Sequence, residues 1–157
     1  AIIGNNLVVK MVVGCQDKKA LKETRLMFDQ LQKSFGCRFD GRINLSIEEM
    51  DKFYYGIDIF ILTSKPNTES FGRTLVEAMS RKTVVLTTDA GGSVEVVGNP
   101  NNVYRSADEC IKRILEFFKD KEKMNKEKEK NFRRVREVYS LKNNLSKHLD
   151  MYREIIQ

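Results

Sequence analysis

The chain has 157 residues, about the length of one domain, and its hydrophobic content of 41% is enough for a real core. Its net charge of +6 comes entirely from the tail, because residues 1–110 carry fourteen Lys or Arg against fourteen Asp or Glu, and residues 111–157 carry fourteen against eight. No apolar run approaches the ~20 residues of a membrane span and the N-terminus lacks the pattern of a secretory signal, so we expect a cytoplasmic protein.

Predicted strands and helices alternate along the chain. In the first half they are a strand over Leu7–Val13, a helix over Lys18–Phe35, a short strand at Arg38-Phe39 before Gly41, and a helix from the capping box at Ser46 to Tyr55. In the second half they are a strand over 57–62, a helix from about residue 71, a strand over 83–87, a helix opened by the capping box at Ser106, a charged helix over 119–136 and an amphipathic helix over 141–156. This alternation implies parallel strand pairing, with helices on both faces of the sheet.

The segment from Glu69 to Met79 is the most informative, because two carboxylates, Glu69 and Glu77, bracket the start of a helix. Apolar residues from Phe71 onward recur at helical spacing and predict a buried face, while Gly72 allows a ligand to approach the first turn. Free amides at a helix N-terminus attract an anion such as a diphosphate. Seven residues of helix rise by roughly 9 Å, so one carboxylate can sit at each end of a diphosphate and accept hydrogen bonds from paired hydroxyls.

The block from Ile57 to Val97 resembles the donor-binding half of glycosyltransferase family four, the retaining enzymes with two Rossmann-like lobes known as the GT-B architecture. The resemblance lies in Glu-x-Phe-Gly-x-x-x-x-Glu-Ala-Met starting at Glu69, in the Val-Val that follows, and in Gly-Gly-x-x-Glu ending at Glu95. A weaker resemblance extends from about Leu7 to about Lys121. It implies an α/β fold, a Rossmann-like parallel sheet with helices on both faces.

The same resemblance implies a domain organisation and partners. We expect residues 1–157 to form the C-terminal, nucleotide-sugar donor-binding lobe, with residues 121–157 as basic and amphipathic C-terminal helices. The N-terminal, acceptor-binding lobe of the same enzyme would be its partner. The donor would be a UDP- or GDP-linked sugar, and we expect no cofactor and, without an Asp-x-Asp motif, no catalytic divalent cation.

Site residues follow from the resemblance position by position. Glu69 takes the catalytic position, where it accepts hydrogen bonds from the donor sugar, and Glu77 holds the ribose. The backbone following the short strand at Arg38-Phe39 matches the place where the family grips the nucleobase edge. The remaining donor-binding residues are then Gly41, Arg42, Ile43, Phe71, Gly72, Arg73, Thr74 and Leu75.

The sequence also departs from the family pattern. Lys82 and Val84 stand where Gly and Pro are usual, and residues 99–105 are shorter and more polar than the usual segment. The two basic side chains that hold the diphosphate in the family are not found before Leu7–Val13. We therefore expect the chain to begin late and to belong to a longer polypeptide, since Leu7–Val13 and Ile57–Leu62 would otherwise lack the strand that separates them.

Each site residue has a simpler interpretation. Glu77 can pair with Arg73 or Arg81 at helical i,i±4 spacing. Glu69 and Ser70 can cap the helix, and residues 89–92 can form an ordinary turn. At the level of the whole chain, the alternatives are a non-catalytic nucleotide-sugar binding module and another GT-B enzyme such as a sugar-nucleotide epimerase.

The C-terminal region leaves further alternatives open. The charged helix over 119–136 predicts a solvated face with weak ion pairs, and its alternative is peripheral contact with anionic lipid headgroups. With no aromatic interleaving beyond Phe132, we expect no nucleic acid partner. The stripe over 141–156 covers its own sheet or crosses onto the partner lobe, and His148 is expected at the surface. The three cysteines, Cys15, Cys37 and Cys110, are expected to be reduced structural thiols.

Overall fold

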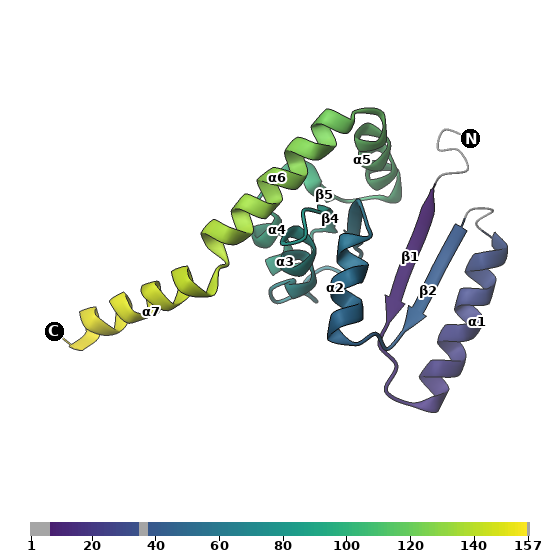
Figure 1. Cartoon of the computed structure of the whole chain (residues 1–157), viewed down its shortest axis with the longest axis horizontal. Helices are drawn as coiled ribbons and strands as arrows, with labels where there is room; N and C mark the ends of the chain where they lie inside the picture. Colours follow the sequence, from purple (N-terminus) through teal and green to yellow (C-terminus); the bar gives the residue numbers. More distant parts are fainter. Residues whose placement is uncertain (1–6, 35–37, 157) are drawn as a thin grey trace. The chain divides into compact units, whose positions relative to one another are not determined.

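The computed structural model describes residues 7–34 and 38–156, so Phe35 and Cys37 lie outside the described residues. The chain divides into two compact units, Ala1–Phe53 and Tyr54–Gln157 (Figure 1). In each unit, parallel strands are flanked by helices, which confirms the predicted α/β Rossmann-like class. None of the described helices has the length and hydropathy needed to cross a membrane.

The first unit is built on a parallel pair of strands. Strand β1 (Val8–Val13) and strand β2 (Arg38–Ile43) are joined by helix α1 (Lys18–Ser34) and pair from Val8 opposite Arg38 to Val13 opposite Ile43. Helix α2 (Ile47–Tyr55) begins in this unit and ends in the next.

Strand β2 is longer than the sequence predicts. The expected strand at Arg38-Phe39 continues to Ile43, so Gly41 lies inside it rather than after it. The physical reason is that the backbone keeps pairing with β1 through Gly41 to Ile43. Gly41 fits there because the ring of Phe28 on α1, which packs edge-on to Phe39 with centroids 5.4 Å apart, occupies the space that a side chain would need. Glycine normally weakens a strand, but at this position its lack of a side chain allows α1 to pack closely on β2.

The second unit carries the bracketed helix. Its three-stranded parallel sheet has the order β3 (Ile59–Leu62), β4 (Val84–Thr88), β5 (Val103–Tyr104). Helix α3 (Arg73–Met79) connects β3 to β4, and helix α4 (Gly92–Val97) with a short 3₁₀ turn connects β4 to β5. Three helices complete the unit: α5 (Ala107–Lys119), α6 (Lys121–Val138) and α7 (Leu141–Ile156).

The centre of this unit is strand β4. Its apolar run Val84–Leu86 is fully buried because α3, α4 and α6 all pack on the strand. From α3, Leu75, Ala78 and Met79 are also fully buried. The core cluster comprises Val84, Leu86, Tyr104, Cys110, Phe117 and Met124.

The two C-terminal helices differ from one another. Helix α6 is tied to the sheet by a buried amide, since Asn131 donates to the Thr83 carbonyl at 3.0 Å, and by an ion pair between Lys128 and Asp58. Helix α7 has no buried residue, and Leu141 and Ile156 are each 83% exposed. The interpretation in which the last helix covers its own sheet is therefore wrong, because the apolar stripe of α7 packs on no described residue closely enough to be buried.

The described strands form two sheets, β1-β2 and β3-β4-β5, rather than one continuous sheet. Strand β5 was not predicted from sequence, since it has only two residues. The expectation of a further strand that separates Leu7–Val13 from Ile57–Leu62 stays a prediction.

Candidate active site

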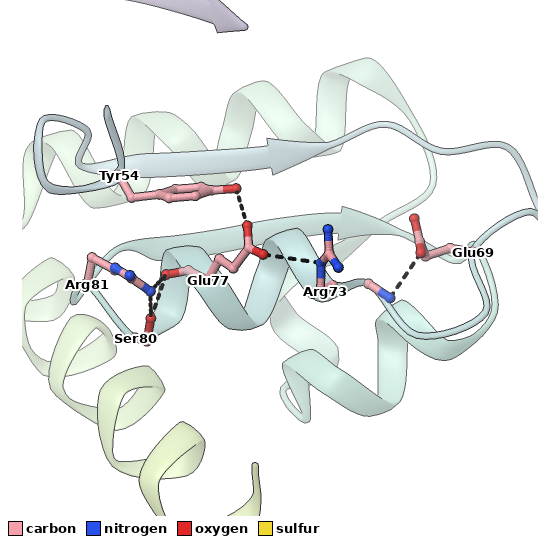
Figure 2. Close-up of polar contacts among 7 residues, drawn as sticks. Tyr54, Glu69, Arg73, Glu77, Ser80 and Arg81 are labelled. Atoms are coloured by element: carbon pink, nitrogen blue, oxygen red, sulfur yellow. Dashed lines mark hydrogen bonds and ion pairs between the residues drawn. The ribbon is translucent and has the colours of Figure 1, made fainter. Parts of the chain in front are cut away.

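Glu69 is positioned by its backbone. Its amide donates to the Ala90 carbonyl at 2.9 Å, and its carbonyl accepts from the Gly92 amide at 2.9 Å, so a short parallel bridge joins it to Gly91. These bonds tie the loop after β3 to the loop after β4. The Glu69 carboxylate then accepts a hydrogen bond from the Gly72 amide through Oε1 at 3.0 Å (Figure 2).

Glycines make this loop crossing possible. Gly91 has φ 103°, a conformation that side chains rarely adopt, and a Cβ at Gly92 would overlap the Ser70 carbonyl and lie 3.0 Å from the Phe71 Cα. Gly72 also has positive φ, 89°, at the position that precedes α3. Side chains at Gly91 and Gly92 are therefore excluded by backbone conformation and by close backbone approach, and the interpretation as an ordinary turn after β4 stays open.

Glu77 is positioned by side chains. The Tyr54 hydroxyl donates to Oε2 at 3.0 Å, and Arg73 Nε lies 3.2 Å from Oε1 in an i,i+4 ion pair (Figure 2). Tyr54 is 3% exposed, whereas the side chain of Arg73 is 87% exposed. Burial of the phenol, followed by the charge of Glu77, raises the pKa of Tyr54 well above its ordinary value. The hydroxyl therefore stays protonated as a donor.

Side-chain hydrogen bonds satisfy the Glu77 carbonyl near the C-terminal end of α3. The Ser80 hydroxyl donates to the Glu77 carbonyl at 2.7 Å, and Arg81 Nη1 donates to the same carbonyl at 3.3 Å and to Ser80 Oγ at 2.5 Å (Figure 2). Both the side chain and the carbonyl of Glu77 are thus held in place.

The first turn of α3 offers fewer free amides than the sequence predicts. Of the backbone amides from Phe71 to Leu75, that of Gly72 already donates to Glu69 and that of Leu75 donates to the Gly72 carbonyl at 2.9 Å. The helix begins at Arg73, so the amides of Arg73 and Thr74 belong to its first turn, where helix geometry supplies no acceptor. The simpler interpretation of Glu69 as a group that caps the helix start is consistent with its bond to Gly72, and the same carboxylate keeps its second oxygen.

Phe71 does not belong to the buried face of the helix, which corrects the sequence interpretation. It precedes α3, is 45% exposed and packs edge-on against Tyr139 with ring centroids 5.6 Å apart. The reason is the left-handed backbone at Gly72, which turns the chain before the helix begins. Tyr139 is in turn covered by Arg134, whose guanidinium carbon lies 5.7 Å from the ring centroid.

Gly41, Arg42 and Ile43 lie in the first compact unit, while Glu69 and Glu77 lie in the second. Their backbone pairs with β1, with Gly41 opposite Met11. Arg42 grips Asp40 with Nε and Nη2 each at 3.0 Å from a carboxylate oxygen, and this hydrogen bond lowers the pKa of Asp40. Their proposed contact with a nucleobase stays a prediction.

Residues 7–34 and 38–156 contain no group of three or more His, Cys, Asp or Glu that could hold a metal ion. The expectation of a metal-independent reaction stays a prediction. His148 is exposed, as expected, and Cys15 and Cys110 are free thiols.

Comparison with known proteins identifies the family. Residues 2–134 match the family model of the glycosyl transferases, group 1. The chain belongs to this family. The motif Glu69–Met79 lies inside the matched range.

A solved structure extends this result to three dimensions. The group 1 glycosyltransferase domain is similar to a structure described as a glycosyltransferase from Rickettsia africae ESF-5, with 25% sequence identity and a TM-score of 0.69. The similarity covers 94% of this chain and 40% of that chain, so the domain spans two fifths of the length of that glycosyltransferase. No curated protein matches the chain.

Sequence reasoning missed the residues that support the site of this glycosyltransferase domain. Tyr54 was not singled out, because its neighbour Tyr55, which is 69% exposed, is the same residue type. The i,i+4 spacing of Met50 and Tyr54 on α2 is the one signal that favours Tyr54 as the inward residue. Arg134 and Tyr139 gave no signal, since they act across about forty residues of sequence.

Proposed function

We propose that the chain is the C-terminal, donor-binding lobe of a retaining glycosyltransferase of family four, which moves a sugar from a UDP- or GDP-linked donor to an acceptor. The observation that carries the proposal is the pair Glu69, shortly before α3, and Glu77, within it, each fixed by hydrogen bonds in a chain that belongs to the group 1 glycosyltransferases. A diphosphate between them would meet the first turn of the helix.

Each carboxylate keeps the capacity to bind a hydroxyl. An ionised carboxylate offers about four acceptor sites. In Glu77 one oxygen accepts from Tyr54 and the other lies beside Arg73, which leaves acceptor sites for a ribose diol. In Glu69 one oxygen accepts from the Gly72 amide, so the other is the natural acceptor for a hydroxyl of the donor sugar.

The chemistry proposed for this site is electrostatic. Transfer stretches the bond between sugar and phosphate toward an oxocarbenium-like state and leaves negative charge on the departing diphosphate. Fixed amides at the first turn, from Arg73 and Thr74, together with the amide of Phe71, would stabilise that charge without reorganising during the reaction. Glu69 would position the sugar and carries no covalent role in the proposal.

The N-terminal lobe of the same enzyme is the proposed partner of α7. The apolar residues of this helix are largely exposed, and the chain covers 40% of the solved glycosyltransferase. Apolar side chains exposed in this number mark an interaction site. The exposed members of the stripe are Leu141, Leu145, Leu149, Tyr152 and Ile156, and Met151 and Ile155 of the same helix are exposed as well.

A cytoplasmic enzyme that touches anionic lipid through α6 and α7 is the second proposal for this surface. It is favoured by the excess of positive charge in residues 111–157. Sedimentation with vesicles that contain phosphatidylserine, in comparison with neutral vesicles, separates the two. Binding only to the anionic vesicles supports contact with anionic lipid. Binding to neither kind of vesicle favours the proposal that α7 contacts the N-terminal lobe.

The donor site itself is tested by titration of the ¹⁵N-labelled chain with UDP and GDP, followed by NMR. We expect amide shifts around Phe71–Glu77 at millimolar ligand, and loss of these shifts in Glu77→Gln. Glu154→Gln, an exposed glutamate of α7, is the matched control. Absence of shifts in this segment with both nucleotides would remove the proposal.

Transfer is separated from its alternatives in the enzyme that carries both lobes. A transferase consumes the donor only when an acceptor is present, apart from slow hydrolysis. An epimerase converts the donor sugar without an acceptor, and a binding module leaves it unchanged.

A further inference from the structure

Tyr54 connects the sheet of the second unit to the Glu77 carboxylate. Its ring packs edge-on against Phe60 of β3 with centroids 5.9 Å apart. Its carbonyl accepts a hydrogen bond from the Thr83 hydroxyl at 3.3 Å, just before β4. The tyrosine is therefore anchored to two neighbouring strands, and its hydroxyl reaches the middle of α3 from there (Figure 2).

The two contacts of the Glu77 carboxylate are unequal. Arg73 is a long, mobile side chain that is 87% exposed, and an exposed i,i+4 ion pair restrains its partner weakly. The side chain of Tyr54 has only two rotatable torsions that move its ring, and the residue is 3% exposed. A hydrogen bond from a buried neutral donor to a carboxylate is also stronger than one between neutral groups. The phenol therefore decides which way the carboxylate points.

The phenol keeps its proton at the pH at which enzymes work. Burial raises the pKa of Tyr54 and the adjacent charge of Glu77 raises it further, while Arg81 and Arg73 lower it by less. The carboxylate therefore meets a hydrogen-bond donor at Oε2 throughout that pH range.

We infer that Tyr54 is a positioning residue, which orients the Glu77 carboxylate for the paired hydroxyls of the donor's ribose. The inference rests on the proposed function, in which Glu77 holds that ribose. It adds a residue of α2, outside the motif, to the specificity of the donor site.

The test compares Tyr54→Phe with Tyr55→Phe, its 69% exposed neighbour, in the 157-residue chain. The probes are UDP and GDP and their 2′-deoxy counterparts, with binding measured by calorimetry or NMR. We expect the wild type and Tyr55→Phe to prefer the ribonucleotide, and Tyr54→Phe to lose about fivefold of that preference, the worth of one hydrogen bond. A purely structural role would weaken both nucleotides alike and leave their ratio unchanged.

The outcomes separate this inference from the function on which it rests. If the wild type binds neither UDP nor GDP, the proposed function fails and the inference with it. If the wild type prefers the ribonucleotide and Tyr54→Phe keeps the full preference, the proposed function stands and the inference is overturned. Equal binding of both nucleotides by the wild type removes the ribose contact of Glu77 and the role of Tyr54 together.

A second measurement needs no ligand. Chemical denaturation of Tyr54→Phe, Glu77→Gln and the double variant gives the coupling between the two side chains. We expect the unfolding equilibrium constant of the double variant to be about fivefold smaller than the value that additive effects of the two single variants would give. Additive effects would contradict the contact that carries the inference.

Discussion

Glu69 and Glu77 are the same residue type, and the molecule holds them in opposite ways. Glu69 lies where two loops cross, and its own amide and carbonyl are bonded to Ala90 and Gly92. Glu77 lies on a regular helix, and its side chain is bonded to Tyr54 and paired with Arg73. One carboxylate is placed by backbone geometry and the other by side-chain contacts.

The difference predicts how each site responds to change. A backbone crossing has no rotamer to adjust, so a small addition at a glycine displaces both loops. A side chain held by a phenol and an exposed arginine can lose one contact and keep the other. A single substitution near Glu69 should therefore cost much of the stability of that region, while a single substitution near Glu77 should cost only part of it.

The largest effect is expected for Gly92→Ala. The new Cβ would overlap the Ser70 carbonyl, and backbone cannot rotate away from it. We expect a loss of about 3 kcal/mol in the free energy of unfolding, at the upper end of the cost of over-packing. Urea denaturation measures it. Gly14→Ala is the control, because a Cβ there meets nothing within 4 Å, and a similar small loss in both variants would contradict the crossing.

The next effect separates the two carboxylates in the complete enzyme. Glu69→Gln should lower kcat by about tenfold or more with little change in KM, because a contact to the reacting sugar strengthens as charge develops. Glu77→Gln should raise KM by about tenfold and leave kcat near its original value, because a ribose contact is made alike in both states. Steady-state kinetics of both variants measures the changes in kcat and KM. Identical changes in the two variants would contradict separate roles for the two carboxylates.

A smaller effect is expected at alkaline pH, through the side-chain contacts that hold Glu77. The pKa of Tyr54 is raised above the ordinary 10.0, so its contribution to stability is complete below about pH 10 and is lost as the pH rises through the folded-state pKa. The slope is about 1.4 kcal/mol per pH unit for one such group. Tyr104, whose pKa burial raises to about 12, behaves alike. Denaturation from pH 9 upward should show a shallower decline in Tyr54→Phe than in the wild type.

The smallest effect is expected at the end of the helix that carries Glu77. Lys82 has φ 55°, at the position where glycine is usual, and is held by Glu129 at 2.6 Å and by the ring of Phe132 at 5.1 Å. Lys82→Gly relieves about 1 kcal/mol of backbone strain and loses a surface pair worth less than about 1 kcal/mol, so the net change should be small. Lys82→Ala keeps the strain and loses the pair. Thermal unfolding should place it below the glycine variant, and the reverse order would contradict the strain.

Local interactions could be predicted from the sequence. The capping box at Ser46 is present in both directions, with the Glu49 amide bonded to the serine hydroxyl at 3.2 Å and the Ser46 amide to the glutamate at 2.8 Å. The Ser106 hydroxyl likewise accepts from the Glu109 amide at 3.2 Å. In each case the partners are three residues apart, so the pattern contains the whole interaction.

Interactions that depend on the assembled sheet could not be predicted in the same way. Tyr54 and Glu77 are 23 residues apart, and Arg134 donates to the Val96 carbonyl across 38 residues. Gly41 was expected after the short strand, and only its pairing with Met11 and the packed ring of Phe28 show why a glycine lies inside that strand. The two carboxylates could therefore be located from the sequence motif, while the groups that orient them could be identified only from the folded structure.

Among the described residues, the free thiols Cys15 and Cys110 give the chain an internal reference and a chemical reporter of unfolding. Cys110 belongs to the core cluster of the second unit and is 8% exposed, and its burial raises the pKa of the thiol. Cys15 lies in the first unit and is partly exposed. Since alkylation needs an accessible thiolate, Cys15 can react in the folded state, whereas the rate at Cys110 follows the opening of the unit that carries both glutamates. Peptide mass spectrometry can thus time the unfolding of the second unit against the reaction of Cys15, without any added label.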